Sequence, residues 1–447
     1  MVTIKGKNYE SVVVRESDTT FVIDEKAELY SGGEISEDDL FYAYAIVEDV
    51  SASPDNNTYK INGHVLGMAG GIMTSGINTT IRVGKGAEVS SALSILGGGG
   101  LGAFGGAIAT TGENSRVIIA KGAEVSGLFG VVIGGADSTA TNSGVIEGSM
   151  MGMIAGDISG GVGLTDMKLV NNGRIESMFG MLAIGVDGAI VENGKNGEII
   201  GFSVGMAAAT MDDTQSSTIN NFGTVRVTMS VPLEDMPPGG GIFLGTTAAI
   251  LGGLGDDTVR NSGVVYGHIV LGGGDDSLDN RGGKIVGQIL GGEGDDTLIV
   301  GKAGDDLVEL DAQGFDTVRS AFTYMLADFV ESLVLTGKKD IDGTGNDLDN
   351  MLTGNNGDND LTGGAGIDTF VFGTKGGKDA ITDFTLVDDI LDISGWTGMT
   401  DLAALKLHAT QKGDDVVIKS GADVLVLADH VLADLDSVDL SVVYALA

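Results

Sequence analysis

Short β-branched segments recur along the first half of the chain, each followed by a turn and a glycine-broken apolar run. The segment at 81–91, IRVGKGAEVSS, returns at 117–127 as VIIAKGAEVSG, and a weaker copy lies at 21–31. Later units begin with an asparagine and a nearby glycine, at Asn142, Asn171, Asn196, Asn220, Asn261 and Asn280. Alternating apolar positions bounded by turn residues are typical of strands, so each unit is predicted to form a strand, a corner and another strand.

The spacing between units is irregular, roughly 20 to 40 residues, which favours a parallel β-helix with variable loops over a propeller. In such coils the branched residues point inward and the asparagines stack at a corner. Three of the four prolines lie at 231–241, a segment without pattern that predicts a boundary or a large lateral loop. Beyond it the composition changes toward Gly-Asp.

The formal net charge of −38 limits the partners that the chain can bind. It argues against nucleic acid and anionic membranes and favours hard cations. Because the acids are densest in the last two-fifths of the chain, self-repulsion there predicts that cation binding and folding are coupled. The absence of cysteine excludes disulfides and thiolate metal sites.

One uncharged stretch, 91–110, has the length of a transmembrane helix. Its many glycines, including Gly97 to Gly100, are poor helix formers, so we expect no stable membrane span. The N-terminal segment has no apolar core of the kind a signal peptide needs, which predicts that any export uses another route.

The second half carries the nonapeptide G-G-x-G-x-D-x-U-x, in which U is a large apolar residue. The segments 252–260 and 291–299 fit it at every defined position, partial copies lie at 272–278 and 304–308, and a second block of copies lies at 343–348, 354–362 and 363–371. Glycines allow positive φ angles that turn carbonyl oxygens inward, the aspartate adds a charged oxygen, and the apolar residue anchors the next strand. Such loops suit Ca²⁺ better than Mg²⁺, because a flexible oxygen cage accepts six to eight ligands. Asp257, Asp276 and Asp296 lie 19 and 20 residues apart, one coil per interval.

These loops resemble the RTX, or haemolysin-type, calcium-binding repeats over about residues 250–447. The tract from Asp316 to Gly354 is similar to the spacer of that family, and segments from Thr369 to Ser394 are similar to the closing part of serralysin-like proteins. The resemblance implies several bound Ca²⁺ ions, export by a type I secretion apparatus from a C-terminal signal, and extracellular folding. It implies metal ligands at Asp257, Asp276, Asp296, Asp306, Asp347, Asp368 and Asn359, with Gly253, Gly255, Gly274, Gly292, Gly294, Gly364 and Gly366.

The predicted fold is therefore all-β, a right-handed parallel β-helix continuing into a calcium-binding parallel β-roll. Residues 1–250 are predicted to form the β-helix, 251–372 the β-roll with its spacer, and 373–447 a closing β segment with the secretion signal. We expect a secreted, extracellular or cell-surface protein.

Three functions are compatible with this architecture. A structural, surface or adhesion protein, with cell-surface polysaccharide as a candidate partner, is favoured because no catalytic constellation emerges. A β-helical polysaccharide lyase or epimerase acting on uronate polymers needs clustered basic residues with a Tyr or His, and His64 is the only histidine of the first 250 residues. A membrane-active toxin needs a long apolar helix, which the glycines oppose.

Overall fold

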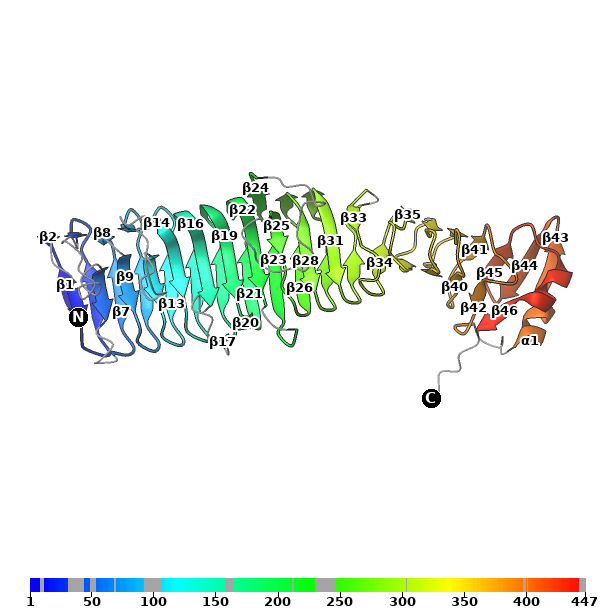
Figure 1. Ribbon diagram of the computed structural model, residues 1–447, viewed down its shortest axis with the longest axis horizontal. Helices are drawn as coiled ribbons and strands as arrows, with labels where there is room; N and C mark the ends of the chain where they lie inside the picture. The colour runs from blue at the N-terminus through cyan, green and yellow to red at the C-terminus, as the bar shows by residue number, and fades with distance from the viewer. Residues whose placement is uncertain are drawn as a thin grey trace. The chain divides into compact units, whose positions relative to one another are not determined.

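The computed structural model describes residues 1–8, 12–30, 44–48, 54–67, 70–91, 106–156, 164–210, 213–229, 247–302, 304–396, 399 and 401–441. The fold is a stack of parallel β coils, as the sequence predicts (Figure 1). Contacts divide the chain into two compact units: unit 1 comprises 1–274 and 282–288, and unit 2 comprises 275–281 and 289–447. This division follows packing, whereas the boundary predicted at 250/251 follows composition. The proline-rich segment 231–241 and most of the uncharged stretch, 92–105, lie outside the described residues.

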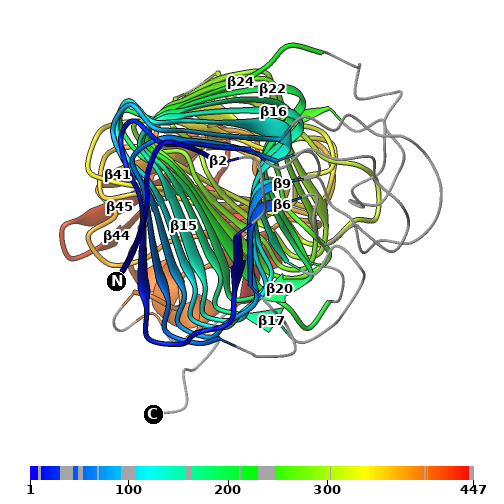
Figure 2. The same ribbon diagram turned by 90° about the vertical axis from the view of Figure 1, so that its left-hand side faces the viewer.

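Each coil of unit 1 has three sides, which Figure 2 shows along the stack. The first side is a ladder of short parallel strands: β1 (Val2–Ile4), β4 (Thr20–Ile23), β7 (Thr58–Ile61), β10 (Thr80–Val83), β13 (Arg116–Ile119), β15 (Thr139–Asn142), β18 (Lys168–Asn171), β21 (Ala189–Asn193), β23 (Ser217–Asn221) and β26 (Asp257–Asn261).

The other two sides share one sheet. The second side contains β2 (Lys7–Asn8), β5 (Glu28–Tyr30), β8 (His64–Gly67), β11 (Glu88–Ser91), β24 (Thr224–Val227), β27 (Val264–Tyr266) and β30 (Lys284–Val286). The third contains β3 (Val12–Val14), β6 (Tyr44–Glu48), β9 (Gly70–Thr74), β12 (Gly106–Thr110), β25 (Ala248–Leu251) and β28 (Ile269–Gly273). Four long strands run through both sides: β14 (Glu124–Ile133), β16 (Val145–Gly156), β19 (Arg174–Ile184) and β22 (Glu198–Ala209). A short pair, β17 (Leu164–Thr165) and β20 (Val186–Asp187), lies apart from them.

The internal repeat predicted from the sequence corresponds to successive coils. Strand β10 pairs in register with β13, so that Ile81 lies beside Val117 and Val83 beside Ile119, all four buried. The Lys-Gly-Ala corner that follows places Gly86 and Gly122 at positive φ, where glycine carries no steric cost. Each unit is thus a strand, a corner and a strand, as predicted.

An inward column on the first side changes character along the stack. Its residues are aliphatic at Ile23, Ile61, Val83 and Ile119, and asparagine at Asn142, Asn171, Asn193, Asn221 and Asn261. Each asparagine Nδ2 donates to Oδ1 of the next, at 2.8 to 3.0 Å, and all are buried. The predicted stacking is confirmed, although Asn193 and Asn221 take the positions expected for Asn196 and Asn220.

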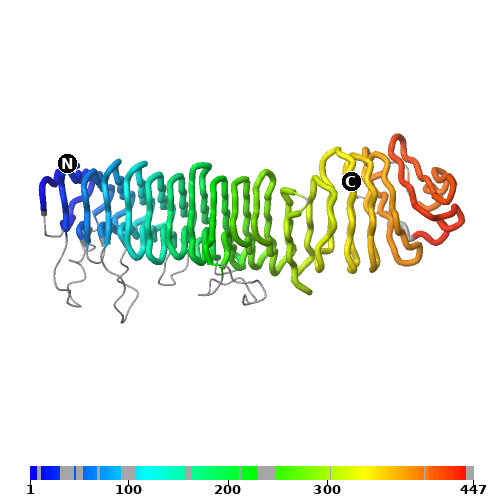
Figure 3. Tube along the Cα trace, turned by 90° about the horizontal axis from the view of Figure 1, so that it is seen from above, coloured from blue at the N-terminus to red at the C-terminus, as the bar shows by residue number. Residues whose placement is uncertain are grey.

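Unit 2 has shorter strands, and its coils appear as successive turns of the tube in Figure 3. One ladder is parallel: β29 (Ser277–Asp279), β32 (Thr297–Ile299), β34 (Thr317–Ser320), β36 (Ser332–Leu335), β38 (Met351–Thr353), β40 (Thr369–Val371), β42 (Ile390–Asp392) and β46 (Asp439–Ser441). Opposite it lie β31 (Gln288–Glu293), β33 (Asp306–Val308), β35 (Tyr324–Met325), β37 (Gly343–Thr344), β39 (Asp360–Thr362), β41 (Lys378–Ile381) and β45 (Asp423–Leu427).

The end of unit 2 departs from the coil pattern. Strands β43 (Ala409–Lys412) and β44 (Asp415–Ser420) are antiparallel, and β44 pairs antiparallel with β45. A short helix, α1 (Leu402–Leu407), and a 3₁₀ turn, η3 (Leu432–Ser437), accompany them. The single tryptophan, Trp396, is buried here and donates its Nε1–H to the carbonyl of Gly373 at 2.8 Å. Its fluorescence therefore reports on unit 2 alone.

Replacing Asn193 by alanine should lower the free energy of unfolding by about 1–3 kcal/mol, because the change removes two buried amide–amide hydrogen bonds, one to Asn171 and one to Asn221. Asn172→Ala, at an exposed position of the same corner, is the matched control and should cost far less. Urea unfolding followed by circular dichroism measures both. Equal losses in the two variants would mean that the ladder contributes nothing beyond the corner itself.

Candidate metal centre

Most of the predicted aspartates are buried at the entrance of a strand. Asp257, Asp276, Asp296 and Asp368 are each at most 2% exposed, and so is Asn359. The cause is strand periodicity: the large apolar residue two positions later packs inside the coil, and residues two apart point to the same side of a strand. Burying Leu298, for example, turns Asp296 inward as well.

The glycines have the conformation that the motif requires in three loops. Gly272 and Gly274, Gly292 and Gly294, and Gly364 and Gly366 all have φ between +99° and +121°. Side chains rarely adopt this region, so these positions need glycine.

The first loop, around Asp257, is closed differently. The Oγ1 of Thr210 accepts hydrogen bonds from the amides of Leu254 and Gly255 at 2.8 and 3.0 Å. The carboxylate of Asp257 accepts one from the Ser217 hydroxyl at 2.6 Å and one from the Gly253 amide at 2.6 Å. Neutral hydroxyls therefore occupy this loop of unit 1.

A ladder of carboxylates links the coils of unit 2. Oδ1 of Asp296 accepts from the backbone N–H of Asp276 at 2.8 Å, and Oδ1 of Asp316 accepts from that of Asp296 at 2.9 Å. The same bond recurs from Asp368 to Asp389 and from Asn359 to Asp379. One carboxylate oxygen of each acid thus holds the preceding coil. The second oxygen of Asp389 accepts from the backbone N–H of Thr385 at 2.6 Å, whereas that of Asp296 has no such partner among the described residues.

One acid of the ladder, Asp296, meets a further acid, Glu309, beside Gly291. Glu309 accepts hydrogen bonds from the amides of Gly291 and Gly292, at 3.0 and 3.3 Å. A Cβ on Gly291 would collide with both Glu309 Oε1 and Asp296 Oδ2, so these two oxygens line one small space. Asp296 Oδ2 is buried and has no hydrogen-bond partner among the described residues.

Burial changes the ionisation of this acid cluster, defined as Asp296, Glu309 and Asp316. Burial, together with the repulsion of neighbouring carboxylates, raises the pKa of Asp296 to about 8, that of Glu309 to about 8 and that of Asp316 to about 6. Farther along unit 2, burial likewise raises the pKa of Asp368 to about 6 and that of Asp379 to about 7. Such groups are costly as bare anions, so they retain a proton or acquire a cation.

The donor set fits a hard cation, because the two side-chain atoms nearest to a Cβ built on Gly291 are the carboxylate oxygens Glu309 Oε1 and Asp296 Oδ2. No three His, Cys, Asp or Glu side chains are grouped as a ready-made site in the described part of the chain. Backbone carbonyls would have to complete the shell, as they commonly do around Ca²⁺.

Two predicted ligands lie elsewhere. Asp306 and Asp347 are exposed, and the buried positions are taken by Asp305 and Asn350. In both loops the buried residue lies two positions before a buried leucine, Leu307 or Leu352, which would have identified it in the sequence. Asp305 accepts hydrogen bonds from Asn280 and Gly301, both at 2.8 Å.

Three acids of the ladder were not predicted from the motif. Asp316 lies in Gly-Phe-Asp-Thr-Val, a shortened copy of the motif within the tract interpreted as spacer. Asp379 and Asp389 also precede buried apolar residues by two positions. Glu309 has no motif signal, because it reaches its place only through the stacking of coils.

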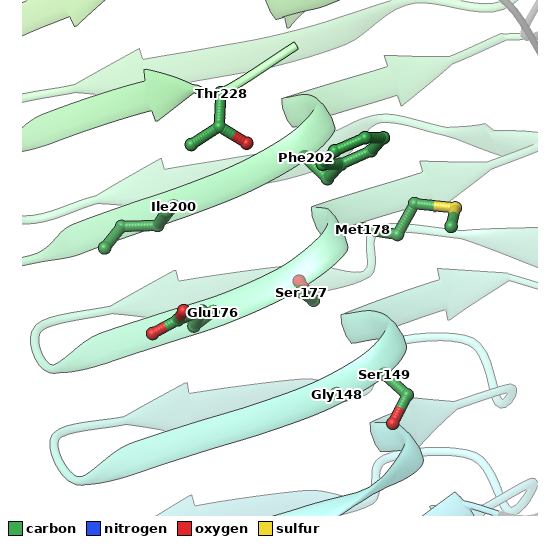
Figure 4. Close-up of a pocket in the computed structure, with 8 residues that line it drawn as sticks. All are labelled: Gly148, Ser149, Glu176, Ser177, Met178, Ile200, Phe202 and Thr228. Atoms are coloured by element: carbon green, nitrogen blue, oxygen red, sulfur yellow. The ribbon is translucent and has the colours of Figure 1, made fainter. Parts of the chain in front are cut away.

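A second candidate site is a shallow groove of about 440 Å³ on unit 1, where strands β16, β19 and β22 bend (Figure 4). Phe202 and Met178, 51% and 37% exposed, lie along it. Its one titratable residue, Glu176, accepts a hydrogen bond from Arg174 at 2.6 Å. The groove lining thus offers no acid–base pair for catalysis.

No family model matches the chain, and no curated protein is significantly similar to it. Among the described residues, none of the helices has the length and apolar character needed to cross a membrane.

In calcium-free buffer, acid should stabilise unit 2. Since burial raises the folded pKa of Asp296 and Glu309 to about 8, above their ordinary values, the protonated forms favour the folded state. This stabilisation is complete below about pH 4 and is lost progressively as the pH rises from about 4 to about 8. Urea midpoints from Trp396 fluorescence in chelator should therefore be lower at pH 8.5 than at pH 5. A midpoint that rises over this range would show that the acids are stabilised as anions.

Proposed function

We propose that the chain is a secreted calcium-binding protein whose unit 2 folds around several Ca²⁺ ions outside the cell. The observation that carries the proposal is the pair of buried carboxylates, Asp296 and Glu309, above Gly291. A bare anion pair at this depth is strongly disfavoured, whereas a divalent cation held by the same oxygens removes the repulsion. The carboxylate ladder repeats this situation at Asp316, Asp368, Asp379 and Asp389.

The residues that would hold the ions form two groups along unit 2. The first comprises Asp276, Asp296, Glu309 and Asp316, and the second comprises Asp368, Asp379 and Asp389. Carbonyl oxygens of the glycine-rich loops would supply the remaining ligands. The cation would neutralise the acids and fix the loops, while hydrogen bonds from backbone N–H groups orient the carboxylates.

The energetics of calcium binding support folding after secretion. With a Kd of about 0.1 mM, millimolar extracellular calcium would add about 1.4 kcal/mol per site, and submicromolar cytosolic calcium almost nothing. The acid-bearing coils of unit 2 would stay loose inside the cell, because a type I secretion apparatus needs an unfolded chain, and they would fold on arrival outside. The resemblance to the RTX repeats and the charge of −38 support this order of events.

A structural, surface or adhesion role is the best-supported biological activity. The coils of unit 1 present a repetitive outer surface, and the groove beside Phe202 offers apolar contact without catalytic groups. Cell-surface polysaccharide is a candidate partner, because aromatic side chains pack against sugar rings while nearby hydroxyls form hydrogen bonds.

The direct test is a Ca²⁺ titration of chelator-treated full-length protein at pH 7.5, with Mg²⁺ as the control ion. Ca²⁺ at up to about 10 mM, the range of extracellular modules, should raise the Trp396 urea midpoint and release protons, and Mg²⁺ should do neither. Calorimetry gives the number of ions. No heat and no change in stability would rule the proposal out.

Neutralising two members of the acid cluster, Asp296 and Glu309, should stabilise the protein in chelator and reduce the stability gained from Ca²⁺. The double change Asp296→Asn and Glu309→Gln removes buried charge, so we expect a higher urea midpoint in chelator at pH 8 and a smaller gain on adding Ca²⁺. Asp311→Asn, at an exposed position of the same coil, is the matched control and should change neither.

Purely structural carboxylates would behave differently. Their removal would lower the midpoint in chelator and in Ca²⁺ alike, and that outcome would exclude Asp296 and Glu309 as cation ligands.

A further inference from the structure

Two consecutive loops of unit 2, at 345–353 and 354–362, carry asparagine where the motif has glycine and aspartate. The pairs are Asn346 with Asn350 and Asn355 with Asn359, so that each pair spans four residues and the second pair follows nine residues after the first. Both loops belong to one coil, between the acids around Asp316 and those around Asp368.

The first pair closes its loop through its own amides. Asn350 Oδ1 accepts from the backbone N–H of Asn346 at 2.7 Å, and Asn350 Nδ2 donates to Asn346 Oδ1 at 3.0 Å. The Nδ2 of Asn346 donates to the carbonyls of Ala327 and Val330 in the preceding coil, at 2.7 and 2.8 Å. Asn350 Nδ2 also reaches Val330, at 3.2 Å.

The second pair repeats this arrangement. Asn359 Oδ1 accepts from the N–H of Asn355 at 2.7 Å, and Asn359 Nδ2 donates to Asn355 Oδ1 at 3.1 Å and to the carbonyl of Ile341 at 2.6 Å. Asn355 Nδ2 donates to the carbonyls of Thr336 and Lys339, at 3.2 and 3.0 Å. We refer to the four residues as the asparagine clamp.

In the clamp, amide groups satisfy the carbonyl oxygens that converge inside each loop, so that no ion is needed there. Carbonyl oxygens that converge inside a loop need a positive partner, and an amide NH₂ group supplies two donors without introducing a charge. Nothing in the clamp is ionised, so burial costs little once the hydrogen bonds form. The acid cluster, by contrast, holds Asp296 Oδ2 without a hydrogen-bond partner among the described residues.

We infer that the coil 345–362 folds without metal and divides the cation sites of unit 2 into two separate blocks. The inference rests on the proposed calcium function and goes beyond it, because it assigns hydrogen bonds rather than ions to two loops of the series. The clamp also orients the first acids of the second block. The backbone N–H of Asn350 donates to Asp368 Oδ1 at 2.9 Å, and that of Asn359 donates to Asp379 Oδ1 at 3.0 Å. The first acids of that block are thus oriented before an ion arrives.

Hydrogen exchange on the wild-type full-length protein in chelator at pH 8 tests the inference without a variant. The amides of Leu348 and Gly357, which donate to Asn346 and Asn355, should exchange at least about tenfold more slowly than those of Asp276 and Asp296. Adding Ca²⁺ should protect the latter pair and leave the former nearly unchanged. Equal protection in chelator would overturn the inference.

Converting the clamp to acids provides the second test. In Asn350→Asp with Asn359→Asp, the loops regain the aspartates of the motif, so the urea midpoint in chelator at pH 8 should fall and calorimetry should count more Ca²⁺ ions than in the wild type. Asn356→Asp adds one charge at an exposed position of the same coil and is the control.

The outcomes separate the two proposals. If the wild type binds no Ca²⁺, the proposed function fails irrespective of the clamp. If the wild type binds Ca²⁺ and the double variant matches the control in both midpoint and ion count, the function stands and the division into blocks is wrong.

Discussion

In-register parallel stacking is the constraint on which the whole molecule depends. It places each side chain beside its counterpart in the next coil, about 4.8 Å away, so a column must be built from residues that tolerate contact with their own kind. Aliphatic residues satisfy this condition by excluding water, as Ile23, Ile61, Val83 and Ile119 do. Asparagines satisfy it because an amide is both donor and acceptor, and the same column continues as the ladder from Asn142 to Asn261.

Aspartates satisfy this condition only when a hydrogen-bond donor, a proton or a cation offsets their negative charge. Burial removes the water that would solvate the anion, and like charges in adjacent coils add repulsion, which is why the pKa of Asp296 and that of Glu309 lie well above their ordinary values. Buried polar groups in adjacent coils are accommodated in three ways along the chain. Hydroxyl groups bind Asp257, the asparagine clamp at 345–362 contains no charge, and the remaining acids need a proton or a cation. The motif alone does not distinguish them, since Asp257 and Asp296 lie in equally good copies of it.

Local pattern was sufficient to predict the coils. The repeat at 81–91 and 117–127 gave the strand and corner directly, and the spacing of Asp257, Asp276 and Asp296 matched one coil each. The inward residue of an irregular loop was harder to predict, because Asp305 and Asp306 are neighbours and only the buried Leu307 decides between them. Glu309 could not be predicted as a site residue. It meets Asp296 only through the stacking of coils, and no motif in the sequence between the two residues indicates that they lie close together.

The long strands of unit 1 show how the same constraint shapes the apolar runs. In β19, residues 174–178 alternate between exposed and buried, whereas 179–183 are buried without interruption; β16 and β22 change in the same way beyond their bulges. The first half of each strand therefore has one face open to substitution, and the second half has none. In the first half of each strand, every second position should therefore vary readily during evolution. In the second half every position should vary slowly, so the rate of sequence change should differ between the two halves of one strand.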